Sequence, residues 1–164
     1  MRMSTGRTGY PSHLEIDAVR LDLRRARVEE LISLRHEVLR HGLPRDAAIF
    51  DGDDAPTSRH YGAFDNGTAV GCATLMLNQW DGEPAWQVRG MATDERFRGR
   101  GLGAALLRMA EAELLGERSP VRVLWCNARV PAIRFYEKLG WAVRCEPFDI
   151  PTAGPHVKMT KRLS

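Results

Sequence analysis

The sequence of 164 residues lacks the features that mark secreted, membrane-spanning or metal-binding chains. Cys72, Cys126 and Cys145 are odd in number and show no C-x-x-C spacing, so they predict buried free thiols rather than a disulfide framework or a zinc site. No run approaches the ~18 consecutive apolar residues of a membrane span. The start of the chain also lacks the apolar centre of a secretory signal. We therefore expect a cytoplasmic protein with no membrane partner and no metal.

Lysine is scarce as well, since arginine outnumbers it 21 to 3 while the net charge is only +3. An arginine-rich composition says little by itself about a partner. The interleaved aromatic residues of a nucleic-acid-binding surface are not evident, so we expect no nucleic-acid partner. Four arginines instead cluster around one glycine-rich turn: Arg96, Arg98, Arg100 and Arg108. This cluster suits a small ligand that carries phosphates.

The length and the 43% of hydrophobic residues predict one globular domain, residues 13–164, after a disordered tail, residues 1–12. Apolar runs and alternation predict strands, whereas three-to-four spacing predicts helices. Strands are expected at residues 18–23, 60–64, 69–78, 85–93, 121–126, 141–144 and 156–160. Helices are expected at residues 27–40, 101–115 and 131–139. Asp65-Asn66-Gly67 is a strong hairpin signal between two of the strands.

The turn Arg-Gly-Arg-Gly-Leu-Gly at residues 98–103 stands between a predicted strand and a predicted helix. Free backbone N–H groups and the helix dipole attract phosphate at such a point. A Walker motif is excluded because no lysine lies near the turn. Residues 99–104 match the dinucleotide fingerprint, but the acidic residue expected about 20 positions later is missing, and the strand there reads Trp125-Cys126-Asn127-Ala128.

A third motif, [QR]-x-x-G-x-[GA], is satisfied by Arg98, Gly101 and Gly103. With residues 91–106 around it and a second segment at residues 124–141, the chain resembles the GNAT superfamily of acyl-CoA N-acyltransferases. The resemblance implies an α+β domain whose central sheet of about six or seven strands is twisted, mixed and mostly antiparallel, with helices on both faces. It also implies transfer of the acetyl group from acetyl-CoA, the co-substrate, to a primary amine of a small molecule or peptide.

The same resemblance implies how acetyl-CoA would be held. The backbone of residues 91–93 would pair with the pantetheine arm like an added strand, and the N–H groups of the turn would hold the pyrophosphate. Asn127 would bind the same arm, although an ordinary helix N-cap before Pro131 explains it nearly as well. The predicted donor-binding residues are Met91, Ala92, Thr93, Arg98, Gly99, Arg100, Gly101, Leu102, Gly103 and Asn127.

Tyr136 is the predicted general acid, because the family places a tyrosine here beside the cofactor sulfur. A phenol with a reference pKa of about 10 can protonate a thiolate of comparable basicity. Phe135 and Leu139 are expected to form the core face of the helix, which would leave Tyr136 facing a cleft. A ping-pong route through Cys126 is less simple than direct attack in a ternary complex, because Cys126 lies in an apolar run without a nearby histidine.

The chain departs from many family members because the strand at residues 85–93 carries no carboxylate to serve as a base. The candidate bases are therefore His60, Glu83 and, third, Asp94, and the proton could also leave through ordered water. The candidate acceptor-binding residues are Arg35, His36, Arg89 and His156. The missing carboxylate keeps a second hypothesis open, a non-catalytic acyl-CoA-binding sensor or regulatory module of the same fold. A homodimer is the commonest closed assembly.

Overall fold

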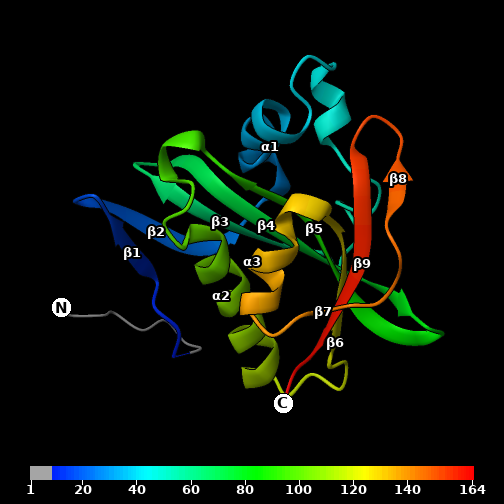
Figure 1. Ribbon diagram of the computed structural model, residues 1–164. Helices are drawn as coiled ribbons and strands as arrows, with labels where there is room; N and C mark the ends of the chain where they lie inside the picture. The colour runs from blue at the N-terminus through cyan, green and yellow to red at the C-terminus, as the bar shows by residue number, and fades with distance from the viewer. Residues whose placement is uncertain (1–8) are drawn as a thin grey trace. The chain divides into compact units, whose positions relative to one another are not determined.

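The computed structural model describes residues 9–164, which contain nine strands, three α-helices and four short 3-10 helices (Figure 1). Neighbouring strands follow the order β1-β2-β3-β4-β5-β6-β9-β7, and β8 pairs with β9. The pairing of β5 with β6 is parallel, whereas β1–β2, β2–β3, β3–β4, β6–β9, β7–β9 and β8–β9 are antiparallel. The predicted α+β class and the mixed, mostly antiparallel sheet are confirmed, with more strands than expected.

The elements begin and end as follows. The strands are β1 (His13–Ile16), β2 (Val19–Ala26), β3 (Arg59–Asp65), β4 (Thr68–Trp80), β5 (Glu83–Thr93), β6 (Val123–Arg129), β7 (Ala142–Val143), β8 (Phe148–Ile150) and β9 (Gly154–Arg162). The helices are α1 (Ile32–Leu39), α2 (Leu102–Gly116) and α3 (Ile133–Lys138), with 3-10 helices η1 (Val28–Glu30), η2 (Arg45–Ala48), η3 (Glu95–Phe97) and η4 (Val130–Ala132).

Two strands were not predicted, and both give weak local signals. In β1 only Ile16 is buried, and β8 has no buried residue, so neither shows the alternation of a half-buried strand. The helix predicted over residues 27–40 is divided at Leu31 into η1 and α1. Residues 1–8 of the predicted tail lie outside the described residues, and at residue 12 the Ser12 carbonyl accepts a hydrogen bond from the Leu23 N–H at 2.8 Å.

The chain divides into two compact units. The first comprises the described residues up to 76 together with residues 90–119. In it, Cys72 packs in a cluster with Leu31 and Leu34, at and after the start of α1. A Cβ on the neighbouring Gly71 would lie 2.8 Å from Leu102 of α2. Because adjacent residues of a strand point to opposite faces, α1 and α2 cover opposite faces of this sheet, as expected.

The second unit comprises residues 77–89 and 120–164. Here β6 pairs with β9 from Val123↔Arg162 to Arg129↔His156, but it pairs with β5 only at Trp86↔Leu124 and Gln87↔Trp125. The hydroxyl of Tyr136 on α3 is hydrogen-bonded to the thiol of Cys126 on β6. The neighbours of Cys126 along β6 therefore point to the face away from α3.

Three hairpins have two-residue turns in which both residues have positive φ. These pairs are Asp17-Ala18 (49° and 62°), Asn66-Gly67 (46° and 83°) and Asp81-Gly82 (51° and 80°). Positive φ at both positions is typical of a type I′ turn, whose twist matches that of the flanking strands. The hairpin predicted at Asn66-Gly67 is therefore confirmed.

Alanine substitutions at two glycines test this backbone assignment. Gly67→Ala should lower the free energy of unfolding by roughly 1–2 kcal/mol, because an L-residue is disfavoured at positive φ. Gly116→Ala, at the last residue of α2 where a Cβ would meet no atom within 4 Å, should raise it by about 0.5 kcal/mol. Urea unfolding followed by circular dichroism measures both, and equal effects at the two positions would contradict the turn assignment.

Candidate active site

The glycine-rich turn that follows β5 is fixed at its beginning by three contacts. The register of β3 and β4 leaves Val70 unpaired, and its carbonyl accepts a hydrogen bond from the Asp94 N–H at 2.8 Å. The Asp94 carboxylate in turn accepts the backbone N–H of Arg96 at 2.9 Å and caps η3. Phe97 is buried at the end of η3. The chain therefore enters the turn from a defined position.

The turn itself presents unpaired backbone N–H groups to open space. Gly99 and Gly101 have φ of +72° and +83°, and a Cβ on either would meet no atom within 4 Å. Gly101 is the N-cap of α2, and the first helical hydrogen bond runs from the Ala105 N–H to the Gly101 carbonyl at 3.0 Å. Within residues 9–164, the backbone N–H groups of residues 99–104 have no backbone acceptor within 3.5 Å in good hydrogen-bond geometry. These groups and the positive end of the helix dipole form a site for an anion.

The side chains around the turn have other partners. Arg98 donates from Nε to the Thr93 carbonyl at 3.2 Å, and Arg100 forms an exposed ion pair with Asp17. Leu102 was predicted to bind the donor, but its side chain is buried, so it can contribute only its backbone. Ala92 is also buried, whereas Met91 and Thr93 are half-buried on β5. The backbone is thus the main hydrogen-bond donor of this site.

Asn127 is not a helix cap. It lies inside β6, and the N-cap of η4 is Arg129, which makes no side-chain cap. The Asn127 amide oxygen accepts a hydrogen bond from the Lys158 ammonium at 3.2 Å. This leaves the amide NH₂ group of Asn127 as the donor of that side chain.

Tyr136 is the one buried residue of α3, whereas Phe135 and Leu139 are half-buried. The predicted core face of this helix was therefore wrong: the six-residue helix packs through Tyr136, whose ring lies 5.2 Å from that of Trp141. Burial raises the pKa of the Tyr136 hydroxyl above its usual range, and it raises the pKa of the Cys126 thiol to about 12. Both groups are consequently protonated at neutral pH.

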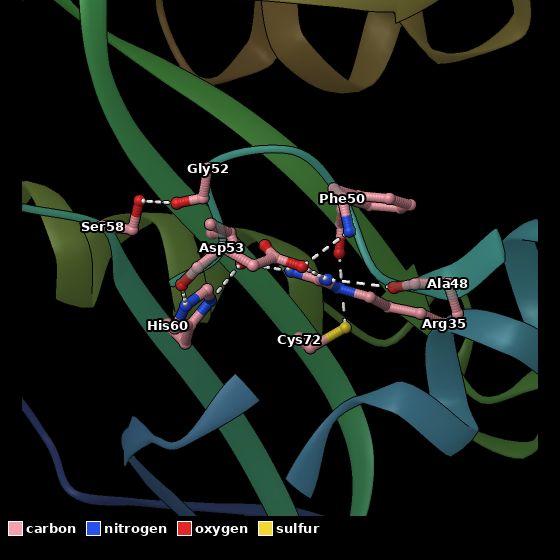
Figure 2. Close-up of polar contacts among 10 residues, drawn as sticks. Arg35, Ala48, Phe50, Gly52, Asp53, Ser58, His60 and Cys72 are labelled. Carbon is pink, nitrogen blue, oxygen red and sulfur yellow. Dashed lines mark hydrogen bonds and ion pairs between the residues drawn. The ribbon is translucent and has the colours of Figure 1, made fainter. Parts of the chain in front are cut away.

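Arg35 lies in a buried polar network (Figure 2). Its guanidinium pairs with the Asp53 carboxylate at 2.6 and 3.1 Å and donates to the Ala48 carbonyl at 3.2 Å and the Thr74 hydroxyl at 2.8 Å. The side chain is 0% exposed. The prediction that Arg35 binds the acceptor was therefore wrong, because the bidentate pair and full burial remove it from any ligand.

His60 belongs to the same network. Its Nε2 donates to the Asp53 carbonyl at 2.9 Å (Figure 2). Its Nδ1 lies 2.8 Å from the Thr74 hydroxyl. Both ring nitrogens are occupied, so the geometry argues against His60 as a base for an acceptor amine. Hydrogen bonds from Arg96 lower the pKa of Asp94, which makes that carboxylate a weaker base. Glu83 is exposed at the first residue of β5.

Comparison with known proteins assigns the family. Residues 25–141 match the model of the acetyltransferase (GNAT) family. The chain belongs to this family. YitI of Bacillus subtilis (strain 168), an uncharacterized N-acetyltransferase, is 36% identical over 149 residues, which cover 87% of this chain and 97% of that protein.

Solved structures share the fold of this GNAT acetyltransferase at low identity. An acyl-CoA N-acyltransferase from Pseudomonas aeruginosa superposes with a TM-score of 0.69 at 18% identity, over 86% of this chain and 99% of that one. An aminoglycoside 6′-N-acetyltransferase complexed with coenzyme A superposes with a TM-score of 0.67 at 14% identity, over 87% of this chain and 97% of that one. These structures show the fold of the chain, and the family match together with YitI identifies it as a GNAT acyltransferase.

The remaining predicted acceptor residues, His36, Arg89 and His156, are divided between the two units. His36 is in the first unit, and its Nε2 donates to the Leu43 carbonyl at 2.6 Å. His156 is in the second unit, buried on β9, and its Nδ1 donates to the Gly154 carbonyl at 2.7 Å. Arg89 is half-buried on β5. Among residues 9–164, no helix is long and apolar enough to cross a membrane, and no group of three or more His, Cys, Asp or Glu residues could hold a metal ion.

Two residues of the acetyltransferase sites were not predicted as such. The Asp53 carboxylate is the buried counter-ion of Arg35. Asp53 lies in an acidic loop, and nothing in the composition of that loop indicates that one of its carboxylates is buried against an arginine. Lys158 is two residues from His156 on β9, so alternation along that strand could have placed both on one face.

Replacing Asp53 tests the buried pair. Asp53→Asn should lower the free energy of unfolding by roughly 3–5 kcal/mol, because it leaves the Arg35 guanidinium buried without its counter-ion. Glu117→Gln is the matched control, since it breaks the more exposed pair with Arg59 and should cost about 1 kcal/mol or less. Chemical denaturation measures both. A loss of less than about 1 kcal/mol for Asp53→Asn would show that the pair does not stabilise the fold.

Proposed function

We propose that this acetyltransferase moves the acetyl group of acetyl-CoA to a primary amine by direct attack in a ternary complex. The observation that supports this proposal most strongly is the turn at residues 99–104, where backbone N–H groups without acceptors converge at the start of α2 in a chain of the GNAT family. Such a site is suited to the pyrophosphate of coenzyme A.

The donor would be held mainly by the backbone. The N–H groups of the turn would donate to the pyrophosphate, and the exposed guanidinium of Arg98 can add a charge-assisted hydrogen bond. Arg100 can do the same if it gives up or shares its ion pair with Asp17. The backbone of residues 91–93 would pair with the pantetheine arm, and the amide NH₂ of Asn127 would donate to the same arm.

In the transfer step, the lone pair of the neutral amine attacks the thioester carbonyl carbon, and the carbon–sulfur bond breaks. The amine nitrogen loses a proton, and the leaving thiolate gains one. We assign the second proton to Tyr136, because its hydroxyl is protonated and hydrogen-bonded to the sulfur atom of Cys126. Burial makes this hydroxyl a weaker acid than a free phenol, and a proton from water restores it after the transfer. Cys126 is a poor nucleophile, since burial raises its pKa to about 12 and keeps it a thiol.

The proton of the amine would pass to water. His60 and Asp94 are engaged in the structural hydrogen bonds described above, which leaves Glu83 as the remaining predicted base. Glu83 stands at the opposite end of β5 from the residues assigned to the pantetheine arm. We therefore propose no dedicated base. A thiol-release assay across amines, beside acetyl-CoA calorimetry, tests the function, and binding without turnover of any amine would favour the non-catalytic module.

Gly101→Ala tests the role of the turn in donor binding. A Cβ at this position points into the space that the pyrophosphate would occupy, so acetyl-CoA affinity should fall roughly tenfold or more. Gly82→Ala is the matched control, because Gly82 also has a positive φ (+80°) and also has no atom within 4 Å of a Cβ. Gly82→Ala should lower the free energy of unfolding by a similar amount and leave the dissociation constant of acetyl-CoA unchanged. Equal affinities of the two variants in calorimetry would remove the turn from the donor site.

Tyr136→Phe tests the general acid. We expect kcat to fall roughly a hundredfold, because the leaving thiolate loses its proton donor, while the dissociation constant of acetyl-CoA changes little. Cys126→Ala is the control for lost packing in the same place, and it should keep most of the turnover. Unchanged kcat in Tyr136→Phe would remove Tyr136 from the mechanism, and a stable acetyl-enzyme in mass spectrometry would overturn direct transfer.

A further inference from the structure

The second unit carries a surface of aromatic and polar side chains on the face of its sheet away from α3. We call it the Lys158 surface, and it consists of Asn78, Trp80, Trp125, Asn127, Phe148 and Lys158. Asn127 and Lys158 are directly opposite each other in the β6–β9 register. They share this face with Trp125, which is two residues from Asn127, whereas Cys126 between them faces Tyr136.

Lys158 is a cation held in place without a carboxylate. Its ammonium donates to the Asn127 amide oxygen at 3.2 Å and lies 4.9 Å from the ring centroid of Trp125 and 5.4 Å from that of Phe148. Within the described part of the chain, no Asp or Glu forms an ion pair with it. Lys158 is half-buried as a residue, and a cation that is partly removed from water without a carboxylate partner favours the binding of an external anion.

The rings beside Lys158 are fixed by their own contacts. The indole N–H of Trp125 donates to the Asn78 amide oxygen at 2.8 Å, and the Asn78 NH₂ donates to Gln87 at 2.7 Å. The rings of Trp80 and Trp125 lie 5.8 Å apart at an angle of 40°. Since the polar atom of the Trp125 ring is already satisfied, the ring offers a preformed apolar surface. Such a surface suits a flat or aliphatic group next to the anion.

We propose that the acceptor is an amine that also carries a carboxylate beside a flat apolar group, and that Lys158 pairs with this carboxylate and determines specificity. The inference rests on the proposed function, in which Asn127 contacts the cofactor arm. Lys158 uses the oxygen of Asn127 and leaves its NH₂ to that arm. The anion-binding ammonium is therefore one hydrogen bond away from the residue assigned to the donor.

The test compares acids with their amides. Initial rates of acetyl-CoA-dependent acetylation are measured for 4-(aminomethyl)benzoate and L-phenylalanine, each against its carboxamide. Binding of the same four compounds is followed by tryptophan fluorescence without acetyl-CoA. The variants are Lys158→Met, which removes the charge, Lys158→Arg, which keeps it, and Lys138→Met, an exposed control on α3.

We expect the acids to bind and react better than the amides. Lys158→Met should raise KM for the acids roughly tenfold to a hundredfold, the range for loss of a charge-assisted hydrogen bond, with kcat and the amides little changed. Lys158→Arg should retain most of the preference for acids, and Lys138→Met should retain all of it.

Acids and amides that react equally well would overturn the inference and leave the acetyltransferase function intact. Binding of the acids that depends on Lys158, without turnover of any compound, would support the inference and overturn the proposed function. If the acids do not bind and are not preferred over the amides as substrates, the inference is overturned.

Discussion

The buried ion pair of Arg35 and Asp53 is the interaction on which the first unit depends. A fully buried guanidinium is tolerated only if hydrogen-bond acceptors surround it, and these acceptors come from separate parts of the chain: the loop after η2, the Thr74 hydroxyl on β4 and the Ala48 carbonyl. The strand β5 passes so close that a Cβ on Gly90 would lie 3.1 Å from the Arg35 side chain. The pair therefore fixes the loop, α1, β4 and β5 together, and β5 leads directly into the glycine turn.

The donor recognition that we propose uses the backbone more than side chains. The left-handed conformations of Gly99 and Gly101 leave a row of N–H groups at the start of α2, and the packing of Leu102 against Gly71 fixes that start on β4. The acceptor recognition that we propose uses side chains instead. A cation and three aromatic rings of the second unit present the side-chain chemistry that would distinguish one amine from another.

Features set by local sequence were predictable, whereas those set by distant partners were not. The hairpin at Asn66-Gly67, the apolar face of α2 and the glycine turn depend on neighbours in the chain, so their patterns are visible in the sequence. The structural role of His60 depends on Asp53 and Thr74, and the burial of Tyr136 depends on Cys126 and Trp141. No spacing rule indicates such pairings, because they arise only when strands and helices pack.

One calorimetric comparison tests the identity of the donor. The glycine turn alone also satisfies a dinucleotide fingerprint, so acetyl-CoA and NADH are titrated separately into the same preparation. We expect saturable heat with acetyl-CoA and none with NADH. Saturable binding of NADH without binding of acetyl-CoA would contradict it.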